Sequence, residues 1–286
     1  MIGHAGMGRQ TVAILGGWGM LGSDLAVACQ DRGFELRVFD LPEFDILDPK
    51  QVEHAIDAAD AVINCAAYTN VDGAESEKEL AHRVNGDAVG QLGRLAAERG
   101  KWVLHFSTDF VFDGELDRPY VETDPPNPIN EYGRSKLAGE LLLQLSDCSH
   151  CIVRLEWTYG SHGNNFVKKI VARARASGQL KVVSDQVGSP TATTEVADVA
   201  CRLLEQRTEG LFHFANSGYA SRFEVAQFIT AELSLKAEVT PCASSDYPAP
   251  ARRPLNSRFD CTKIQALLGE PIKSWQEAMA HFLRHL

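Results

Sequence analysis

Residues 11–22 read TVAILGGWGMLG, an apolar run followed at once by glycines. The run 11–15 predicts a buried β-strand, and the helical spacing of the apolar residues that follow predicts a helix over 20–32. Glycines at positions 16, 19 and 22 suit a tight turn, close approach of the backbone to a pyrophosphate, and close packing of helix on strand. In this strand–turn–helix context they predict a dinucleotide-binding loop, with the helix N-terminus facing the phosphates.

Outward from this loop, predicted strands and helices alternate. We expect strands over 35–39, 61–65, 102–107 and 151–154, and helices over 49–58, 77–99 and 129–145. Apolar strands that alternate with helices indicate a parallel sheet covered on both faces. Further helices are expected over 166–176, 194–205, 222–233, 262–268 and 274–286, and a proline-rich loop over 241–254.

The fold class that follows is α/β. We expect a Rossmann-type doubly wound parallel sheet in a nucleotide-binding domain over residues 1–160. A smaller C-terminal α/β substrate-binding domain is expected over 161–286, with some of its segments returning to the first domain.

Composition excludes several classes of protein. The 286 residues are 44% hydrophobic and 23% charged, with a formal charge of −10. This balance argues against disorder, and the net charge argues against nucleic acid and against an anionic membrane as partners. The sequence has no apolar run long enough to span a membrane, and residues 1–10, expected to be a short leader, lack the apolar core of a signal peptide. We therefore expect a cytoplasmic protein.

The seven cysteines are odd in number and are expected to be reduced thiols. Cys148 and Cys151 have C-x-x-C spacing, but a second pair of ligands at suitable spacing is missing, so no metal site is predicted.

Asp40 ends the second predicted strand, where a carboxylate can receive the ribose hydroxyls of an adenosine. An acid there repels a 2′-phosphate, so NADH is favoured over NADPH, although a helix-capping role for Asp40 remains open. The cofactor contacts expected from this part of the chain are Gly16, Trp18, Gly19, Met20, Leu21, Gly22 and Asp40.

Tyr132 and Lys136 stand four residues apart at the start of a predicted helix, and therefore on one helical face. A nearby ammonium favours the phenolate and is expected to lower the pKa of the tyrosine. The tyrosine could then exchange a proton with a substrate oxygen near neutral pH.

Together, these features resemble the extended short-chain dehydrogenase/reductase family. Further motifs narrow the resemblance to the dTDP-4-dehydrorhamnose reductases. They read NCAAYTNVD at 64–72, STDFVFDG at 107–114, NNF at 164–166, DQVGSPT at 185–191 and RPLNS at 253–257. The resemblance thus extends over nearly the whole chain, residues 11–286.

The resemblance implies that NADH or NADPH reduces the C4 keto group of a dTDP-4-dehydro-6-deoxy sugar, giving dTDP-L-rhamnose. By motif position, Tyr132 would donate the proton, Lys136 would hold the nicotinamide ribose, and Thr108 would hydrogen-bond the reacting oxygen. Further cofactor contacts implied by the resemblance are Asp45, Ile46, Ala66, Ala67 and Tyr68. Implied contacts to the sugar nucleotide are Thr69, Val71, Trp157, Phe166 and Arg253.

Two positions depart from the family pattern. Phe110 stands where the family usually has a tyrosine, which removes a hydroxyl from the sugar side. Glu156 stands where small hydroxyl residues are usual, and beside an anionic substrate it would be unfavourable unless it pairs with Arg154 or points away. Both departures bear on the identity of the sugar more than on the chemistry.

Two other functions remain open, a nucleotide-sugar epimerase and a non-catalytic dinucleotide-binding regulatory subunit. A 4,6-dehydratase is disfavoured, because Phe110 occupies the place of the glutamate that would follow Asp109. The resemblance also allows a homodimer. It allows magnesium too, since part of the family forms a magnesium-linked dimer, but the glutamate ligands do not map onto this sequence.

Overall fold

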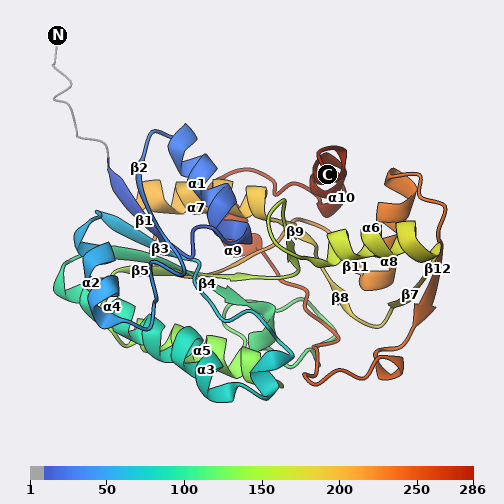
Figure 1. The fold of residues 1–286 in the computed structure, drawn as a ribbon, viewed down its shortest axis with the longest axis horizontal. Helices are drawn as coiled ribbons and strands as arrows, with labels where there is room; N and C mark the ends of the chain where they lie inside the picture. Colours follow the sequence, from blue (N-terminus) through green and yellow to red (C-terminus); the bar gives the residue numbers. More distant parts are fainter. Residues whose placement is uncertain (1–9) are drawn as a thin grey trace, which may run out of the picture.

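The structure, a computed structural model, describes residues 10–286, so most of the expected leader lies outside the described residues. A six-stranded parallel sheet has the order β10-β5-β4-β3-β1-β2 (Figure 1). Its strands are β1 (Thr11–Leu15), β2 (Glu35–Phe39), β3 (Ala61–Asn64), β4 (Trp102–Thr108), β5 (His150–Leu155) and β10 (Gly210–Phe214).

The strand order reverses at β1, the second strand from one edge of this sheet, which pairs with β2 on one side and with β3 on the other. Successive strands therefore diverge from this point and leave a crevice outside their carboxyl ends. The predicted doubly wound parallel sheet is confirmed, and the first five strands match their predicted ranges closely.

Helices cover both faces of the sheet, because each buries one apolar face against it. One core lies between the sheet and α1 (Met20–Asp31), α7 (Thr193–Gln206) and α9 (Thr262–Leu268). The other lies between the sheet and α2 (Pro49–Asp57), α4 (Ala88–Glu98) and α5 (Glu131–Gln144). Both cores are mainly apolar, as expected for a parallel sheet covered on both faces.

A separate apolar core holds the remaining elements together around Trp275 and Met279. Its helices are α6 (Phe166–Ser177), α8 (Arg222–Glu232) and α10 (Trp275–Arg284). Three two-stranded sheets accompany them: β6 (Thr158–Tyr159) with β9 (Thr191–Ala192), β7 (Gln179–Val183) with β12 (Glu238–Cys242), and β8 (Val187–Gly188) with β11 (Ala220–Ser221). In Figure 1, α6 and α8 lie to the right of the main sheet.

The chain crosses between these cores more than once. β10 belongs to the main sheet and α7 packs on its face, although both follow residue 160. The boundary at residue 160 stays a prediction, but substrate-side elements and sheet elements alternate beyond it. β10 itself was not predicted, although its sequence, GLFHF, is a short apolar run of strand length.

Two predicted ranges need correction. The helix expected over 77–99 is divided into α3 (Lys78–His82) and α4 by a π-helical segment, Arg83–Asp87. The loop expected over 241–254 begins inside β12, since Pro241 pairs in register with Val182. Proline is tolerated there because β12 is an edge strand.

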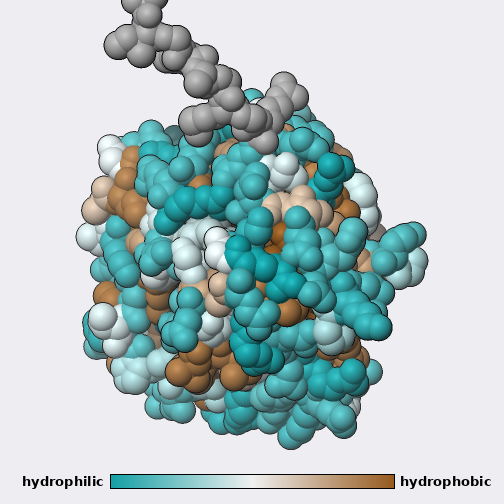
Figure 2. Space-filling view, turned by 90° about the vertical axis from the view of Figure 1, so that its left-hand side faces the viewer, coloured by the Kyte–Doolittle hydropathy of each residue, from teal (hydrophilic) through white to brown (hydrophobic). Residues whose placement is uncertain are grey.

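Among the helices of residues 10–286, none is long and apolar enough to cross a bilayer. Figure 2 shows the side of the molecule on which α2 lies in Figure 1. Hydrophilic residues dominate that face, and hydrophobic ones gather only in separate small patches.

Candidate active site

The glycine loop packs so tightly that side chains are excluded from it. Gly16 has a φ of +73°, and a Cβ there would lie 2.6 Å from the backbone nitrogen of Ala66. A Cβ on Gly22 would collide with the carbonyl oxygen of Gly16. The bare backbone therefore forms a cradle at the N-terminus of α1, and such a cradle fits a dinucleotide pyrophosphate.

A cleft of about 620 Å³ opens from this loop at the carboxyl ends of the strands. Thirteen predicted site residues line it: Gly16, Gly19, Met20, Leu21, Gly22, Asp40, Asp45, Ile46, Ala66, Ala67, Thr69, Tyr132 and Lys136. Ten further residues line it that were not predicted: Leu41, Phe44, Asn64, Cys65, Val84, Phe106, Ser107, Thr158, Gly163 and Asn164. Five of these are sequence neighbours of a predicted residue, namely Leu41, Phe44, Cys65, Ser107 and Thr158.

The other predicted residues lie outside the lining of this cleft. They are Trp18, Tyr68, Val71, Thr108, Trp157, Phe166 and Arg253. Trp18 is exposed on the loop, and its backbone N–H donates to Asp40 at 2.7 Å. Leu41 donates its backbone N–H to the second oxygen of Asp40 at 2.8 Å. The Asp40 carboxylate is thus held at the rim of the cleft by two backbone donors.

Helix α5 brings Tyr132 and Lys136 to the cleft. Asn130 caps its first turn by accepting from the Gly133 N–H at 2.7 Å, and it donates to the Arg252 carbonyl at 2.7 Å. A Cβ on Gly133 would collide with the carbonyl oxygen of Phe110, so the helix start packs directly on the segment after β4. The ring of Phe110 meets that of Tyr132 edge to face, with centroids 5.6 Å apart.

Lys136 is almost fully buried. Its Nζ donates to the Phe106 carbonyl at 2.7 Å and lies 3.3 Å from His105 Nε2. Burial lowers the pKa of Lys136 to about 8, while the charges of Glu140 and Cys65 raise it. A lysine in this state gains and loses its proton near neutral pH.

The pKa of Tyr132 shifts against the prediction. Burial, followed by the nearby Asp109 carboxylate, raises it to about 12, and a hydrogen bond with Thr108 lowers it. The prediction that the ammonium of Lys136 lowers the pKa of Tyr132 is wrong, because loss of solvation raises this pKa instead. Tyr132 is therefore a protonated phenol at neutral pH, the form that a proton donor requires.

Thr108 is held by the residue that follows it. Its hydroxyl donates to Asp109 at 3.0 Å, and the Ser257 hydroxyl donates to the other oxygen of Asp109 at 2.5 Å. Asp109 is buried, and burial raises its pKa. The contact between Ser257 and Asp109 also joins the end of β4 to the C-terminal RPLNS motif.

The guanidinium of Arg222 lies over the rings of both Trp157 and Phe166. The Arg222 guanidinium lies 3.5 Å from the ring centroid of Trp157 and 4.8 Å from that of Phe166. Trp157 has a φ of +46°, a left-handed backbone that bulky residues rarely adopt. Such strain persists where the surroundings impose it, and it gathers at ligand sites.

Of the two arrangements considered for Glu156, pairing with Arg154 is wrong. Glu156 is buried and instead accepts the backbone N–H groups of Ser189 at 2.8 Å and Phe259 at 3.2 Å. Arg154 binds Glu140 through two hydrogen bonds, of 2.6 and 2.9 Å. Burial, together with Asp109, raises the pKa of Glu156 well above its ordinary range.

Arg253, predicted to meet the diphosphate, is bound to Asp72 by a two-pronged ion pair of 2.6 and 2.7 Å. The Arg253 guanidinium holds the pKa of the Asp72 carboxyl below its usual value. Its side chain remains partly exposed, so an anionic ligand could compete for it.

Asn85 was not predicted, although it supports the site. It holds the backbone of Tyr68 by accepting at 2.8 Å and donating at 3.0 Å, and it donates to the Ser135 hydroxyl at 2.9 Å. Asn85 lies in the π-helical segment that interrupts the predicted helix. Such segments are frequent at functional sites, but the helical pattern of residues 77–99 is continuous and predicts no interruption.

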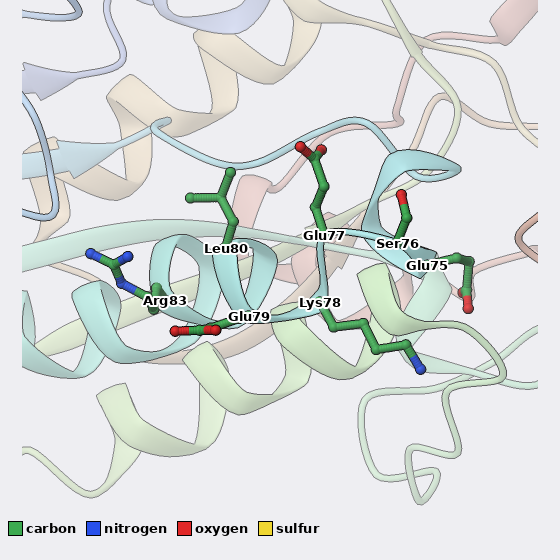
Figure 3. Close-up of a pocket in the computed structure, with 7 residues that line it drawn as sticks. All are labelled: Glu75, Ser76, Glu77, Lys78, Glu79, Leu80 and Arg83. Atoms are coloured by element: carbon green, nitrogen blue, oxygen red, sulfur yellow. The ribbon is translucent and has the colours of Figure 1, made fainter.

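A second hollow lies over α3 and the turn before it (Figure 3). Figure 3 shows the lining residues Glu75, Ser76, Glu77, Lys78, Glu79, Leu80 and Arg83. Their side chains spread in different directions. Glu75 accepts the backbone N–H of Glu131 at 2.9 Å, and Lys78 pairs with Glu131 at 3.4 Å. This segment therefore supports the start of α5 rather than forming a site.

Within the described part of the chain, no three His, Cys, Asp or Glu side chains gather in a way that could hold a metal ion. Cys148 and Cys151 carry free thiols, as do the other five cysteines. Residues 10–286 therefore offer no cluster of such side chains to magnesium.

Comparison with known proteins gives one family. Residues 10–286 match the family of the RmlD substrate binding domain. A dTDP-4-dehydrorhamnose reductase of Sinorhizobium fredii is 39% identical over 89% of this chain and 90% of its own length. The crystal structure of a dTDP-4-dehydrorhamnose reductase from Bacillus anthracis, in complex with NADP, is 33% identical, with a TM-score of 0.94 over 98% of this chain and all of the other.

A UDP-glucose 4-epimerase of Thermus thermophilus, solved with NAD, shares the fold more distantly. It is 22% identical, with a TM-score of 0.84 over 96% of this chain and 98% of the other. At this identity the likeness concerns the fold alone.

Proposed function

The chain belongs to the family of the RmlD substrate binding domain, and from this we propose that it reduces the C4 keto group of a dTDP-4-dehydro-6-deoxy sugar. The substrate we propose is dTDP-4-dehydrorhamnose, and the product dTDP-L-rhamnose, as the names of its relatives indicate. The observation that carries the proposal is the meeting of a protonated tyrosine and a buried lysine in a cleft that opens from a glycine cradle.

When bound, a reduced nicotinamide dinucleotide supplies the hydride. The glycine loop would hold its pyrophosphate, and Asp40 its adenosine ribose. Lys136, fixed by the Phe106 carbonyl, would hold the nicotinamide ribose. Tyr132 would donate its phenolic proton to the C4 oxygen of the sugar as negative charge develops there, and Thr108 would hydrogen-bond the same oxygen.

On the substrate side, we propose that Thr69, Val71, Trp157 and Phe166 surround the sugar nucleotide and that Arg253 meets the diphosphate. Phe110 supports an apolar surface beside the sugar, because its ring packs against Tyr132. Glu156 is no obstacle to an anionic ligand, since its oxygens are occupied by backbone donors and burial favours its neutral form.

The test is an assay of cofactor oxidation against a panel of dTDP-4-keto-6-deoxy sugars, with the product identified by NMR. We expect stoichiometric loss of NADH or NADPH and formation of the 4-hydroxy sugar. An epimerase would return its cofactor to the oxidised form, so the amount of NADH or NADPH in the assay would not change. A regulatory subunit would bind dinucleotide without turnover, so either result would contradict the proposal.

We also propose a preference for NADH, which rests on Asp40 at the rim of the cleft. Asp40→Ala should relax the discrimination between NADH and NADPH by about 10-fold or more, on the order of 1–3 kcal/mol. The measurement is kcat/KM for each cofactor at fixed sugar nucleotide. Glu43→Ala is the matched control, because it removes the same charge from an exposed position of the same loop. Equal use of both cofactors by the wild type, unchanged in Asp40→Ala, would refute the preference.

Cytoplasmic location and a homodimer remain predictions of the sequence, and magnesium is allowed only by the family resemblance. Sedimentation with and without a chelator would test the last two together.

A further inference from the structure

Two buried polar residues lie behind Lys136 and have no part in the reaction proposed above. Asn64 ends β3, and His105 lies beside it as its register partner in β4. Their exposed fractions are 1% and 0%. Buried polar groups are hydrogen-bonded, and here the bonds form a chain that runs from the end of β3 to the cleft.

One fixed donor sets the direction of every bond in this chain. The backbone N–H of Ala66 can only donate, and it meets Asn64 Oδ1 at 3.1 Å. Asn64 therefore turns its amide Nδ2, a donor, toward His105 Nδ1 at 3.2 Å. Since Nδ1 accepts, a neutral ring carries its hydrogen on Nε2. That N–H points at Lys136 Nζ, 3.3 Å away.

His105 keeps this neutral form. Burial, followed by the charges of Lys136 and His150, lowers the pKa of His105 well below its usual value. The ring therefore acts as a fixed dipole whose donor end faces the lysine.

The protonation of Lys136 decides whether this contact is favourable. An uncharged amine has a lone pair that can accept from His105 Nε2, while it donates to the Phe106 carbonyl. An ammonium has donors only, so two donors would face each other. The hydrogen bonds of Asn64 and His105 thus stabilise the uncharged lysine. They lower the pKa of Lys136, as burial does. Glu140 on α5 and Cys65 after β3 act in the opposite direction.

We propose that Asn64 and His105 are positioning residues that set the proton affinity of Lys136 through the tautomer of the imidazole. The effect of Asn64 and His105 on the reaction rests on the function proposed above. A lysine that exchanges its proton near neutral pH can resupply the proton that Tyr132 loses in each turnover.

The test measures Lys136 directly in the protein without substrate or cofactor. Lysine is labelled with ¹³C at Cε, and its resonances are followed by NMR from about pH 6 to about pH 11. Lys136→Arg identifies the signal. In the wild type, we expect Lys136 to titrate near pH 8. Asn64→Asp should raise this pKa by about one pH unit or more, because a carboxylate accepts from His105 Nδ1 and moves the hydrogen off Nε2.

The control separates the tautomer from the added charge. In a His105→Phe background, Asn64→Asp should lose most of its effect on Lys136, as a double-mutant cycle requires of coupled residues. An equal rise in both backgrounds would mean that the new carboxylate acts only through its charge, and would overturn the proposal. A wild-type lysine that titrates at its ordinary value of about 10.4 would overturn it too.

His105→Gln covers the case in which phenylalanine does not fold, since its amide oxygen can accept from the ammonium and should raise the pKa of Lys136. An unchanged or lowered pKa in this variant would count against the proposal. The pH profile of kcat/KM is a second readout. Its upper limb should move to higher pH in Asn64→Asp together with the pKa measured by NMR. Because the NMR titration needs no turnover, it remains decisive even if the wild type reduces no sugar in the panel.

Discussion

Replacing Tyr132 with phenylalanine is expected to lower kcat by about 100-fold or more, with the affinity for the dinucleotide nearly unchanged. In the proposed reaction the phenol is the acid, because burial raises its pKa to about 12 and keeps it protonated. Thr108 can hydrogen-bond the reacting oxygen, but its hydroxyl is far too weak an acid to replace a tyrosine. Single-turnover kinetics with the sugar nucleotide would measure the loss in the chemical step itself.

A matched variant guards against a general effect of losing a tyrosine hydroxyl. Tyr159 is buried in the separate apolar core around Trp275 and Met279, and its hydroxyl has no hydrogen-bond partner among residues 10–286. Tyr159→Phe should therefore leave kcat near that of the wild type. Near-normal turnover in Tyr132→Phe would show that Tyr132 is not the acid, and the residue roles taken from the family would fail at this position.

The parts of the site that were predicted are those encoded within a short stretch of chain. The glycine loop joins one strand to the next helix, and Tyr132 and Lys136 stand four positions apart on α5. Helical and strand periodicity place such residues without knowledge of the fold. The family motifs then supplied Thr108 at the end of β4, which local patterning alone would leave as a polar strand end.

Contacts between distant segments were not predictable in the same way. The sequence left two arrangements open for Glu156, pairing with Arg154 or pointing away. The strand ends at Leu155, however, and the chain turns at Trp157 through a left-handed backbone. Glu156 therefore turns to Ser189, while α5 supplies the true partner, Glu140. No spacing in the sequence indicates a pairing that depends on how a helix crosses a strand.

The prediction for the pKa of Tyr132 was wrong for a related reason. A lysine four residues away indicates a charge nearby, but only packing decides how much water remains around both groups. In the folded chain burial dominates for Tyr132 and Lys136, and it favours the uncharged form of each.

The ion pair between Arg154 and Glu140 is where we expect the largest effect on stability. Both side chains are at most 3% exposed, and the guanidinium also lies 5.0 Å from the ring centroid of Phe112. Glu140→Gln would leave a buried cation without its partner, so the free energy of unfolding should fall by about 3–5 kcal/mol. Urea unfolding followed by circular dichroism measures this loss. Glu35→Gln, which breaks an ion pair with Arg37 in which both side chains are about half exposed, should cost at most about 1 kcal/mol.

A double replacement shows whether the fall in the free energy of unfolding comes from losing the ion pair or from leaving Arg154 without a partner. Glu140→Leu combined with Arg154→Met should be more stable than Glu140→Gln, because two apolar side chains leave no charge unsatisfied. A double variant no more stable than Glu140→Gln would mean that the unpaired cation is not the cause of the loss. The same residue also links the core to the site, since the charge of Glu140 raises the pKa of Lys136. Glu140→Gln should therefore lower that pKa further, and the upper limb of the kcat/KM profile should move to lower pH, opposite to the shift expected for Asn64→Asp.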